Sequence, residues 1–443
     1  MHCKIANKIL ENGFECYIVG GAVRDQMMGK FPNDFDLATN AKPKDIENIF
    51  SGEKINFVGK SFGVFRVNDI EVATLRKDFN IDENRQNCFV EYSERIEEDL
   101  ARRDLTINAM AIDMKTNELI DPFNGKEDIK NRSINFVGNP SDRIREDYLR
   151  ILRAIRFRTI IGGEYEEKTK ESIHSSCHLI RNISKERIRT EILKTLVVQK
   201  ASRFFRDLHE FDILEYIFPS LEKCFDHYNG VYHHTDVFNH SMICGDALST
   251  KNKLLKLAGY LHDVGKPPSY VMNNEENFAN HEMMSYELVR EELSNLKFSN
   301  DEIDFISNVI KHHMRNIMVS PLFTISKKSF KKTLFNLEKD NVNFKDLVRL
   351  KIGDRRGNHK KFPYLKQEIR ETLSLYDEMI KNPSVSPTGL KSLNINGEDI
   401  ISLGFKEGPI IGRILNDCLN AILEEKLTNE KGELKEYIKT QFG

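Results

Sequence analysis

The spacing between apolar residues along the sequence changes near residue 125. Before that point, short apolar runs of strand length alternate with glycine turns and helix-like segments. Beyond it the strand signals fade, and apolar residues recur every three or four positions, as on a helix that buries one face. At 443 residues the chain is also too long for a single hydrophobic core. The sequence therefore predicts an N-terminal α/β head followed by a long helical body.

Local patterns predict where the main elements lie. Beyond the head, Ile144, Tyr148, Ile151 and Ile155 fall on one stripe of a single amphipathic helix. Within the head, apolar runs bounded by turn residues predict strands at residues 14–19, 56–58, 63–67, 71–75 and 109–114.

Two glycines follow the first predicted strand, and a pair of aspartates lies shortly downstream. Gly20 and Gly21 stand between a strand and a helix, where backbone N–H groups can approach a phosphate closely. Asp34 and Asp36 are two residues apart on an apolar strand, so both carboxylates project from the same face. Such a pair is costly without a cation, and hard oxygen ligands suit Mg²⁺. The glycine turn and the aspartate pair together favour phosphoryl transfer as the chemistry. The alternative is that the glycines form an ordinary tight turn and the aspartates lie in a solvated acidic loop.

These residues carry a resemblance to a known family. Residues 20–25 read G-G-A-V-R-D and residues 34–39 read D-F-D-L-A-T, which resembles the nucleotidyltransferase head of class II tRNA CCA-adding enzymes and bacterial poly(A) polymerases. Residues 100–111 are similar to the family motif R-R-D-[FL]-T-x-N-A, and residues 121–129 to its hinge motif D-P-[FY]-x-G-x-x-D-[IL]. The resemblance implies a polymerase-β-like head whose catalytic residues are Asp34 and Asp36. The nucleotide-binding residues that it implies in the head are Gly20, Gly21, Arg24, Arg103, Asp104 and Asn108.

Another motif lies on the predicted helix after the head. Asp147, Arg150 and Arg153 are spaced by three, so we expect them to share one helix face opposite the apolar stripe. A carboxylate beside a guanidinium offers the acceptors and planar donors that pair with a base edge, although the same spacing suits an ordinary ion pair. The stretch resembles the family motif E-D-x-x-R. That resemblance implies that Asp147 and Arg150 select cytosine or adenine without a nucleic-acid template, with Arg153 beside them.

Two further segments resemble the family. Residues 75–90 are polar and poorly periodic, which predicts a mobile loop like the one CCA-adding enzymes use to switch from C to A. Within it, residues 82–87 read D-E-N-R-Q-N where the family commonly has D-x-R-R-P-D. Residues 181–191 resemble the motif R-x-[IL]-S-x-E-R-[IV]-x-x-E. There Ser184 is the predicted N-cap of a helix, and the role of Glu191 stays open between structure and function.

Histidines gather in the helical body. The apolar run 254–261 ends in His262 and Asp263, followed by the helix breakers Gly265 and Pro267. Imidazole and carboxylate ligands suit a divalent transition metal whose bound water acts as nucleophile. The residues that match the H…HD…D signature of HD-domain phosphohydrolases, and that we expect to bind metal, are His240, His262, Asp263 and Asp354. The candidates for a second metal position are His281 and either His312 or His313.

Together these features predict an α+β chain: a small α/β nucleotidyltransferase head, a long all-α neck, an HD domain and a helical tail. The expected domains are residues 1–125, 126–222, 223–360 and 361–443. The resemblance implies addition of CCA to tRNA 3′ ends from CTP and ATP with Mg²⁺, and phosphohydrolysis of 2′,3′-cyclic or terminal phosphates by the HD domain. Two alternatives stay open. One is a poly(A) polymerase or A-adding enzyme of the same family, and the other is an HD phosphohydrolase whose inert head binds tRNA.

The balance of charged residues limits which partners the protein can bind. The chain has 66 Lys and Arg residues against 68 Asp and Glu, which excludes a promiscuous nucleic-acid coat protein. Residues 142–206, however, hold sixteen Lys and Arg against nine Asp and Glu, a basic strip suited to phosphate contacts with tRNA. The seven cysteines are scattered without a C-x-x-C pair, and no apolar run has the length of a membrane span. We therefore expect a cytoplasmic protein that does not enter the membrane.

Overall fold

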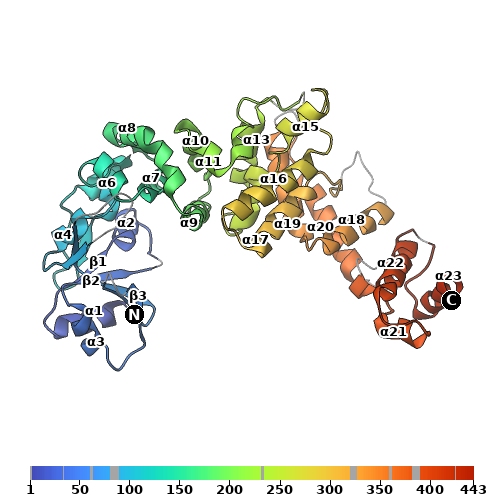
Figure 1. Cartoon of the computed structure of the whole chain (residues 1–443), viewed down its shortest axis with the longest axis horizontal. Coiled ribbons are helices and arrows are strands. Elements are labelled where there is room, and N and C mark those ends of the chain that lie inside the picture. Colours follow the sequence, from blue (N-terminus) through green and yellow to red (C-terminus); the bar gives the residue numbers. More distant parts are fainter. Residues whose placement is uncertain are drawn as a thin grey trace. The chain divides into compact units, whose positions relative to one another are not determined.

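The chain forms two compact units, Met1–Tyr216 and Ile217–Gly443. In this computed structural model the described residues are 2–32, 34–59, 63–79, 89–230, 234–319, 327–358, 362–381, 390–424 and 426–443. The sheet belongs to the first unit and the second is helical (Figure 1). The four domains expected from the sequence divide the chain more finely than these two units, so their boundaries stay predictions.

A seven-stranded mixed sheet forms the head of the first unit. Its order is β3-β4-β5-β2-β1-β8-β9; β2 runs parallel to β5, and the other neighbours are antiparallel. The interior strand β1 is buried along its whole length, which explains its uninterrupted apolar sequence. All the expected strands are present with their ends moved by a few residues. The strands of the sheet are β1 (Cys16–Val19), β2 (Asp36–Thr39), β3 (Ile55–Gly59), β4 (Val64–Val67), β5 (Ile70–Thr74), β8 (Ala111–Asp113) and β9 (Leu119–Ile120).

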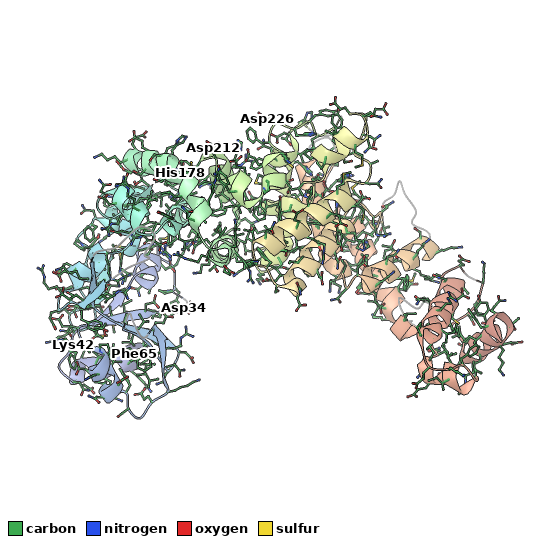
Figure 2. The ribbon with its side chains drawn as sticks, in the orientation of Figure 1. Asp34, Lys42, Phe65, His178, Asp212 and Asp226 are labelled. Carbon is green, nitrogen blue, oxygen red and sulfur yellow. The ribbon has the colours of Figure 1, made fainter. Side chains whose placement is uncertain are left out.

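Short helices complete the head. Helices α1 and α2 pack against β1, and Phe65 of β4, labelled in Figure 2, is fully buried in this part of the structure. The 3-10 turn Thr106–Asn108 packs on α5 and α2. The helices of the head and its hinge are α1 (His2–Glu11), α2 (Gly21–Met27), α3 (Pro43–Ile49), α4 (Ile96–Ala101) and α5 (Gly125–Asn131).

The segment expected to be a loop is in part a hairpin. Strands β6 (Arg76–Phe79) and β7 (Phe89–Tyr92) pair in antiparallel register, with Phe79 opposite Phe89. Neither strand shows clear alternation of apolar and polar residues, so the pairing was not visible in the sequence. The central part of the predicted loop, residues 80–88, lies outside the described residues.

The neck is helical apart from a short parallel pair, β10 (Ser133–Ile134) and β11 (Glu164–Tyr165). Ser184 is the N-cap residue of α9, as expected, although its side chain makes no capping hydrogen bond. The helices are α6 (Pro140–Glu146), α7 (Leu149–Ile161), α8 (Glu167–Ser176), α9 (Lys185–Thr195), α10 (Ser202–Glu210) and α11 (Leu214–Ile217).

The prediction of one continuous helix through Ile144 and Ile155 was wrong. The helix is interrupted at Asp147, whose backbone is extended (φ −156°), and α7 starts at Leu149. The Asp147 carboxylate accepts a hydrogen bond from the Leu149 backbone N–H at 3.2 Å. A side chain that bonds its own backbone in this way competes with the helix, so the apolar stripe continues across two helices. Asp147 consequently does not share a helix face with Arg150 and Arg153.

The second unit is built from packed helices. Helix α13 packs against α14 and α19, and α16 packs against α17. A Cβ atom at Gly357 would lie 2.6 Å from His240 Nδ1, so this glycine allows α19 to approach α13 closely. The helices around this core are α13 (Val237–Ala247), α14 (Lys253–Leu261), α15 (Lys266–Met272), α16 (His281–Asn295), α17 (Asn300–Lys311), α18 (Lys327–Lys339), α19 (Phe344–Gly357) and α20 (Lys366–Lys381).

The tail helices share a hydrophobic cluster, against which Phe335 of α18 also packs. Helices α21 (Gly397–Ser402), α22 (Pro409–Leu423) and α23 (Lys431–Phe442) enclose a cluster that includes the buried Ile400 and Leu434. None of the helices in the described parts of the chain has both the length and the hydropathy needed to span a bilayer.

A buried ion pair joins the two long neck helices, and we expect it to be structural. Glu191 on α9 accepts from Arg156 Nε on α7 at 2.6 Å, and Glu191 is 2% exposed. Replacing Glu191 with alanine leaves a buried guanidinium without its partner, so we expect Glu191→Ala to lower the free energy of unfolding by about 3–5 kcal/mol. Calorimetry measures this loss. The control is Glu210→Ala, which removes an exposed partner of Lys170 and should cost about 0.5 kcal/mol.

Candidate functional site

A cavity of about 590 Å³ in the first unit collects the residues predicted to bind a nucleotide. It is lined by Asp36 and by every residue of that predicted set, which lie on the head and on the neck helices. Eight cationic side chains and three carboxylates line it, so the cavity suits a polyanion. The predicted residues that it brings together are Gly20, Gly21, Arg24, Asp36, Arg103, Asp104, Asn108, Asp147, Arg150 and Arg153.

The glycine turn allows Arg103 to lie against the backbone. Gly20 has φ 69°, in the left-handed region that favours glycine, and a Cβ there would lie 2.9 Å from Arg103 Nη1. Arg24, one turn into α2, donates from Nη1 to Asn108 Oδ1 at 2.7 Å. The turn between β1 and α2 is therefore held to the R-R-D motif, which lies far along the chain.

The aspartate pair lies where β2 begins. Asp36 is the first residue of β2, and Asp34 (Figure 2) precedes the strand; both side chains are exposed. Desolvation of the carboxyl group and the nearby Glu71 carboxylate raise the pKa of Asp36. Asp34 adds to this rise, and Arg103 opposes it. A divalent cation relieves such crowding of carboxylates, so the donor set fits Mg²⁺. Asp34 is not among the described residues that line the cavity.

Glu71 is a carboxylate that our reading of the sequence did not single out. It lies on β5 directly opposite Asp36, because β2 and β5 pair in parallel register. Its side chain accepts a hydrogen bond from Arg66 at 3.1 Å. The only sequence signal is an acidic residue in an otherwise apolar strand, and the strand pairing decides that it faces Asp36.

The R-R-D motif is held by ion pairs. Arg103 donates to Asp99 at 3.1 Å, and Arg153 Nε donates to Asp104 Oδ2 at 2.5 Å. Burial opposes ionisation of Asp104, but the Arg153 guanidinium prevails and holds the pKa of that carboxyl below its usual range. Asn108 donates to Asp104 at 3.3 Å. Asp104 is thus an anion at neutral pH that fixes the position of Arg153 in the cavity.

Asp147 and Arg150 both line the cavity, and each is held by a partner. Arg187 on α9 donates from Nη2 to both Asp147 oxygens, at 2.8 Å each. Arg150 is 3% exposed and donates to the backbone carbonyls of Arg143 and Arg102, at 2.9 Å each, as well as to Glu146. The two side chains predicted to read a base are therefore oriented by contacts that involve three separate helices.

Sequence reasoning missed several other residues that line this cavity. Phe157 packs beneath Arg24 and Arg153, whose guanidinium carbons lie 4.8 and 5.6 Å from its ring centre. Arg187 belongs to the 181–191 motif, but nothing in that motif showed that it would face Asp147. The additional lining residues are Arg102, Leu149, Arg156, Phe157, Arg187 and Lys194.

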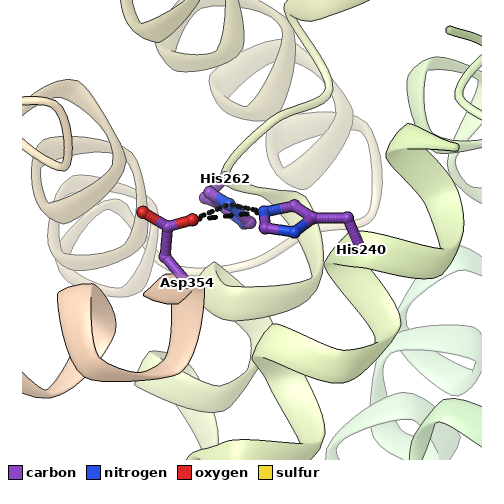
Figure 3. A group of neighbouring side chains, drawn as sticks. All are labelled: His240, His262 and Asp354. Carbon is purple, nitrogen blue, oxygen red and sulfur yellow. Dashed lines mark hydrogen bonds and ion pairs between the residues drawn. The ribbon is translucent and has the colours of Figure 1, made fainter. Parts of the chain in front are cut away.

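The second unit holds a separate cluster of metal-ligand side chains (Figure 3). His240 on α13, His262 after α14 and Asp354 on α19 point toward one another, with ligand atoms within 4.8 Å. His240 Nε2 is 3.2 Å from His262 Nε2 and 3.2 Å from Asp354 Oδ1. Both histidines are fully buried, and this donor set fits a divalent transition metal.

Asp263 extends this cluster. Its Oδ2 lies 3.4 Å from His240 Nε2 and 3.3 Å from His262 Nε2, and its side chain is 2% exposed. The four residues expected to form the HD metal site are thus brought together by three helices. His262, Asp263 and His313 form a further group of ligand atoms within 4.8 Å.

Family comparisons agree with this arrangement. The description "Poly A polymerase head domain" matches residues 16–135, and "Probable RNA and SrmB-binding site of polymerase A" matches residues 164–225. The HD domain matches residues 230–355.

Relatives resemble the chain over different lengths. Poly(A) polymerase I of Haemophilus influenzae is 35% identical over 235 residues, which span 50% of this chain and about half (52%) of that protein. The crystal structure of the Bacillus stearothermophilus CCA-adding enzyme in complex with CTP has the same fold, with a TM-score of 0.70 and 24% identity over 99% of this chain and 96% of that one. The CCA-adding enzyme of Ligilactobacillus salivarius is 30% identical over 98% of this chain and 95% of its own length. Because that likeness covers nearly the whole length of both proteins, the chain belongs to the family of CCA-adding enzymes, which are nucleotidyltransferases.

Proposed function

We propose that the protein adds C, C and A to the 3′ ends of tRNA from CTP and ATP. The cavity in the first unit carries this proposal, because it places Asp36, the Gly20–Gly21 turn and the pair Asp147 and Arg150 around one space. A triphosphate suits the cationic lining, and a base suits the side chains near α7. Full-length likeness to a CCA-adding enzyme supports the same function.

The reaction transfers a nucleotidyl group. The tRNA 3′-oxygen forms a bond to the α-phosphorus of the incoming nucleotide, the bond from that phosphorus to the bridging oxygen breaks, pyrophosphate leaves, and the 3′-hydroxyl proton passes to solvent. Asp34 and Asp36 would hold Mg²⁺, which supplies charge neutralisation at the phosphates. Arg24 and Arg103, which lie beside the glycine turn, bind and orient the triphosphate.

Base selection follows from the groups that α7 and the segment before it present. The Asp147 carboxylate accepts hydrogen bonds, and the Arg150 guanidinium donates them, which together match the donors and acceptors of a cytosine or adenine edge. Each side chain already has protein partners, so we propose that nucleotide binding exchanges part of these contacts for base contacts. We place this activity in the cytoplasm; the cysteines in the described part of the chain are free thiols.

The direct test separates this function from a poly(A) or A-adding enzyme. A tRNA that lacks its last three nucleotides is incubated with CTP alone, ATP alone and both, and the products are sequenced. We expect two C residues with CTP alone and C-C-A with both nucleotides. A homopolymer of A identifies a poly(A) polymerase. Addition of A to a second substrate that already ends in C-C, with no extension of the shorter tRNA, identifies an A-adding enzyme.

The catalytic carboxylates are tested by isosteric amides. We expect Asp34→Asn and Asp36→Asn each to lower the rate of nucleotide incorporation by about a hundredfold or more, because losing a metal ligand removes several kcal/mol of transition-state stabilisation. Single-turnover incorporation into tRNA measures the rate, and filter binding shows whether tRNA is still bound. The matched control is Asp69→Asn in the exposed turn before β5, where φ is 70° and asparagine is well tolerated. Full incorporation by either Asp34→Asn or Asp36→Asn would contradict the assignment.

Arg187 is tested as a residue that positions Asp147. Arg187→Ala removes two hydrogen bonds from the Asp147 carboxylate and leaves the one from the Leu149 N–H, so the carboxylate is held less firmly. We therefore expect the preference for CTP over UTP to fall by about tenfold, within the ~1–3 kcal/mol of one bidentate base contact. The ratio of kcat/KM values for the two nucleotides is the measurement. Arg145→Ala, which removes an exposed arginine from α6, serves as the control. A purely structural role for Arg187 predicts an equal loss for both nucleotides.

We also propose a phosphohydrolase activity for the second unit, because its buried imidazoles and carboxylates converge as metal ligands do. His240, His262, Asp263 and Asp354 would hold a divalent transition metal, which activates water for hydrolysis of 2′,3′-cyclic or terminal phosphates. In the cyclic case water adds across one P–O ester bond, and the released oxygen takes a proton.

We expect His262→Ala to abolish release of phosphomonoester from a 2′,3′-cyclic nucleotide while leaving nucleotide incorporation within about twofold. Chromatography of the hydrolysis products is the measurement. Equal hydrolysis by the variant would show that the HD cluster is not the site.

A further inference from the structure

Four aromatic side chains gather close to the HD cluster. Tyr270 on α15 stacks on Phe278, with ring centres 5.2 Å apart and ring planes inclined by 27°. Tyr228, in the segment before α13, adds a third ring, whose centre lies 6.0 Å from that of Tyr270 and 6.3 Å from that of Phe278. His227 packs edge-on against Tyr270 at 5.7 Å. We call these four residues the aromatic cluster.

One buried lysine connects the aromatic cluster to the HD cluster. Lys266 Nζ lies 5.7 Å from the centre of the Phe278 ring, within the range of a cation–π contact. The same nitrogen lies 2.6 Å from Asp263 Oδ2, and the Lys266 side chain is 9% exposed. Asp263 is one of the residues proposed to hold a metal ion. The aromatic rings and the proposed metal site are therefore neighbours that contact the same ammonium group.

The segment that carries Tyr228 is held in place on both sides of that residue. The backbone carbonyl of His227 accepts a hydrogen bond from the Val237 N–H at 3.1 Å. On the other side, Asn229 is 3% exposed, and its Oδ1 accepts from Lys266 Nζ at 2.7 Å. The position of Tyr228 is therefore fixed by the contacts of its two neighbours in the sequence.

Tyr228 presents an exposed ring that is already oriented. The residue is 51% exposed, although its ring packs against Tyr270 and Phe278. A fixed aromatic ring stacks on a base without first losing conformational freedom. A nucleotide carries a base and a phosphate close together, and here the aromatic cluster and a site suited to phosphate chemistry contact the same lysine. This arrangement favours a nucleotide over a phosphoester that has no base.

We propose that the aromatic cluster binds the base of a nucleotide whose phosphate lies at the HD cluster, with Tyr228 as the residue that stacks on the base. The proposal rests on the phosphohydrolase activity proposed for the second unit, and it names the substrate class as a nucleoside phosphoester rather than a sugar phosphate. Every base has an aromatic face, so stacking selects nucleotides without selecting a sequence. Such a surface suits the last nucleotide of an RNA as well as a free nucleotide.

A fluorescence experiment tests the contact directly, because the chain contains no tryptophan. In the full-length Tyr228→Trp protein we expect adenosine 2′,3′-cyclic phosphate to quench the fluorescence by stacking, and a base-free methyl riboside 2,3-cyclic phosphate to leave it unchanged. The matched control is Tyr286→Trp, because Tyr286 is a partly exposed tyrosine on α16 whose ring faces Arg290 and Lys311 instead. Its fluorescence should respond to neither compound. No quenching in the Tyr228→Trp protein, or equal quenching by the two compounds, overturns the proposal.

Hydrolysis of the same two compounds separates stacking from the reaction at the phosphate. We expect Tyr228→Ala to raise KM for the adenosine compound about tenfold and to keep kcat within about twofold, since a contact made equally before and during the reaction is lost. Tyr228→Phe keeps the ring and should keep the KM of the unmutated protein. For the base-free compound, the KM of the Tyr228→Ala protein should not change.

The outcomes distinguish the stacking surface from the activity on which it rests. Equal KM values for the two compounds in the unmutated protein overturn the stacking surface and leave the phosphohydrolase activity. No hydrolysis of either compound overturns that activity, and the fluorescence of the Tyr228→Trp protein then decides the stacking surface by itself. A short RNA with the same cyclic 3′ end completes the series: a lower KM than that of the mononucleotide supports an RNA end as the ligand, and an equal KM supports a free nucleotide.

Discussion

In both units, groups that repel one another, either like charges or lone pairs, lie close together. In the head, the cavity carries eight cationic side chains, and in the HD cluster four imidazole nitrogens surround one carboxylate. Several of these groups are held in place by a partner of opposite character. Arg153 is held by Asp104, and His313 by a backbone carbonyl. The cationic side chains of the cavity face the space that a triphosphate would occupy, and the imidazole nitrogens of the HD cluster face the space that a cation would occupy.

Glycines set how closely these groups approach. Gly20 lets Arg103 lie against the turn that follows β1, and Gly265 lets the His262–Asp263 turn approach α16. At both positions a Cβ atom would collide with a group of the site itself. The sequence predicted that the glycine turn in the head could bind a phosphate, whereas it indicated Gly265 only as a helix breaker. Its contribution to the HD centre depends on which helix packs against it.

The neck links base selection to packing. Asp147 interrupts the helix that its apolar neighbours predict, and this interruption aims its carboxylate at Arg187 rather than along α7. The Arg156–Glu191 pair joins α7 to α9 in the core. The side chains that are proposed to bind the base are thus positioned by contacts between helices. Their spacing of three residues along the sequence does not position them.

Much of this protein was predictable from local sequence. The α+β architecture, the D-x-D strand, the R-R-D motif and the H…HD…D set each depend on residues close together in the chain or on motifs whose order is itself informative. Other features depend on contacts between distant segments: Glu71 faces Asp36 through strand register, β6 pairs with β7, and Arg187 meets Asp147. The choice of His313 over His312 is of the same kind. Two adjacent histidines are equivalent to any local pattern, and only the packing of α17 against α14 and α16 turns one toward Asp263 and leaves the other to Asp340.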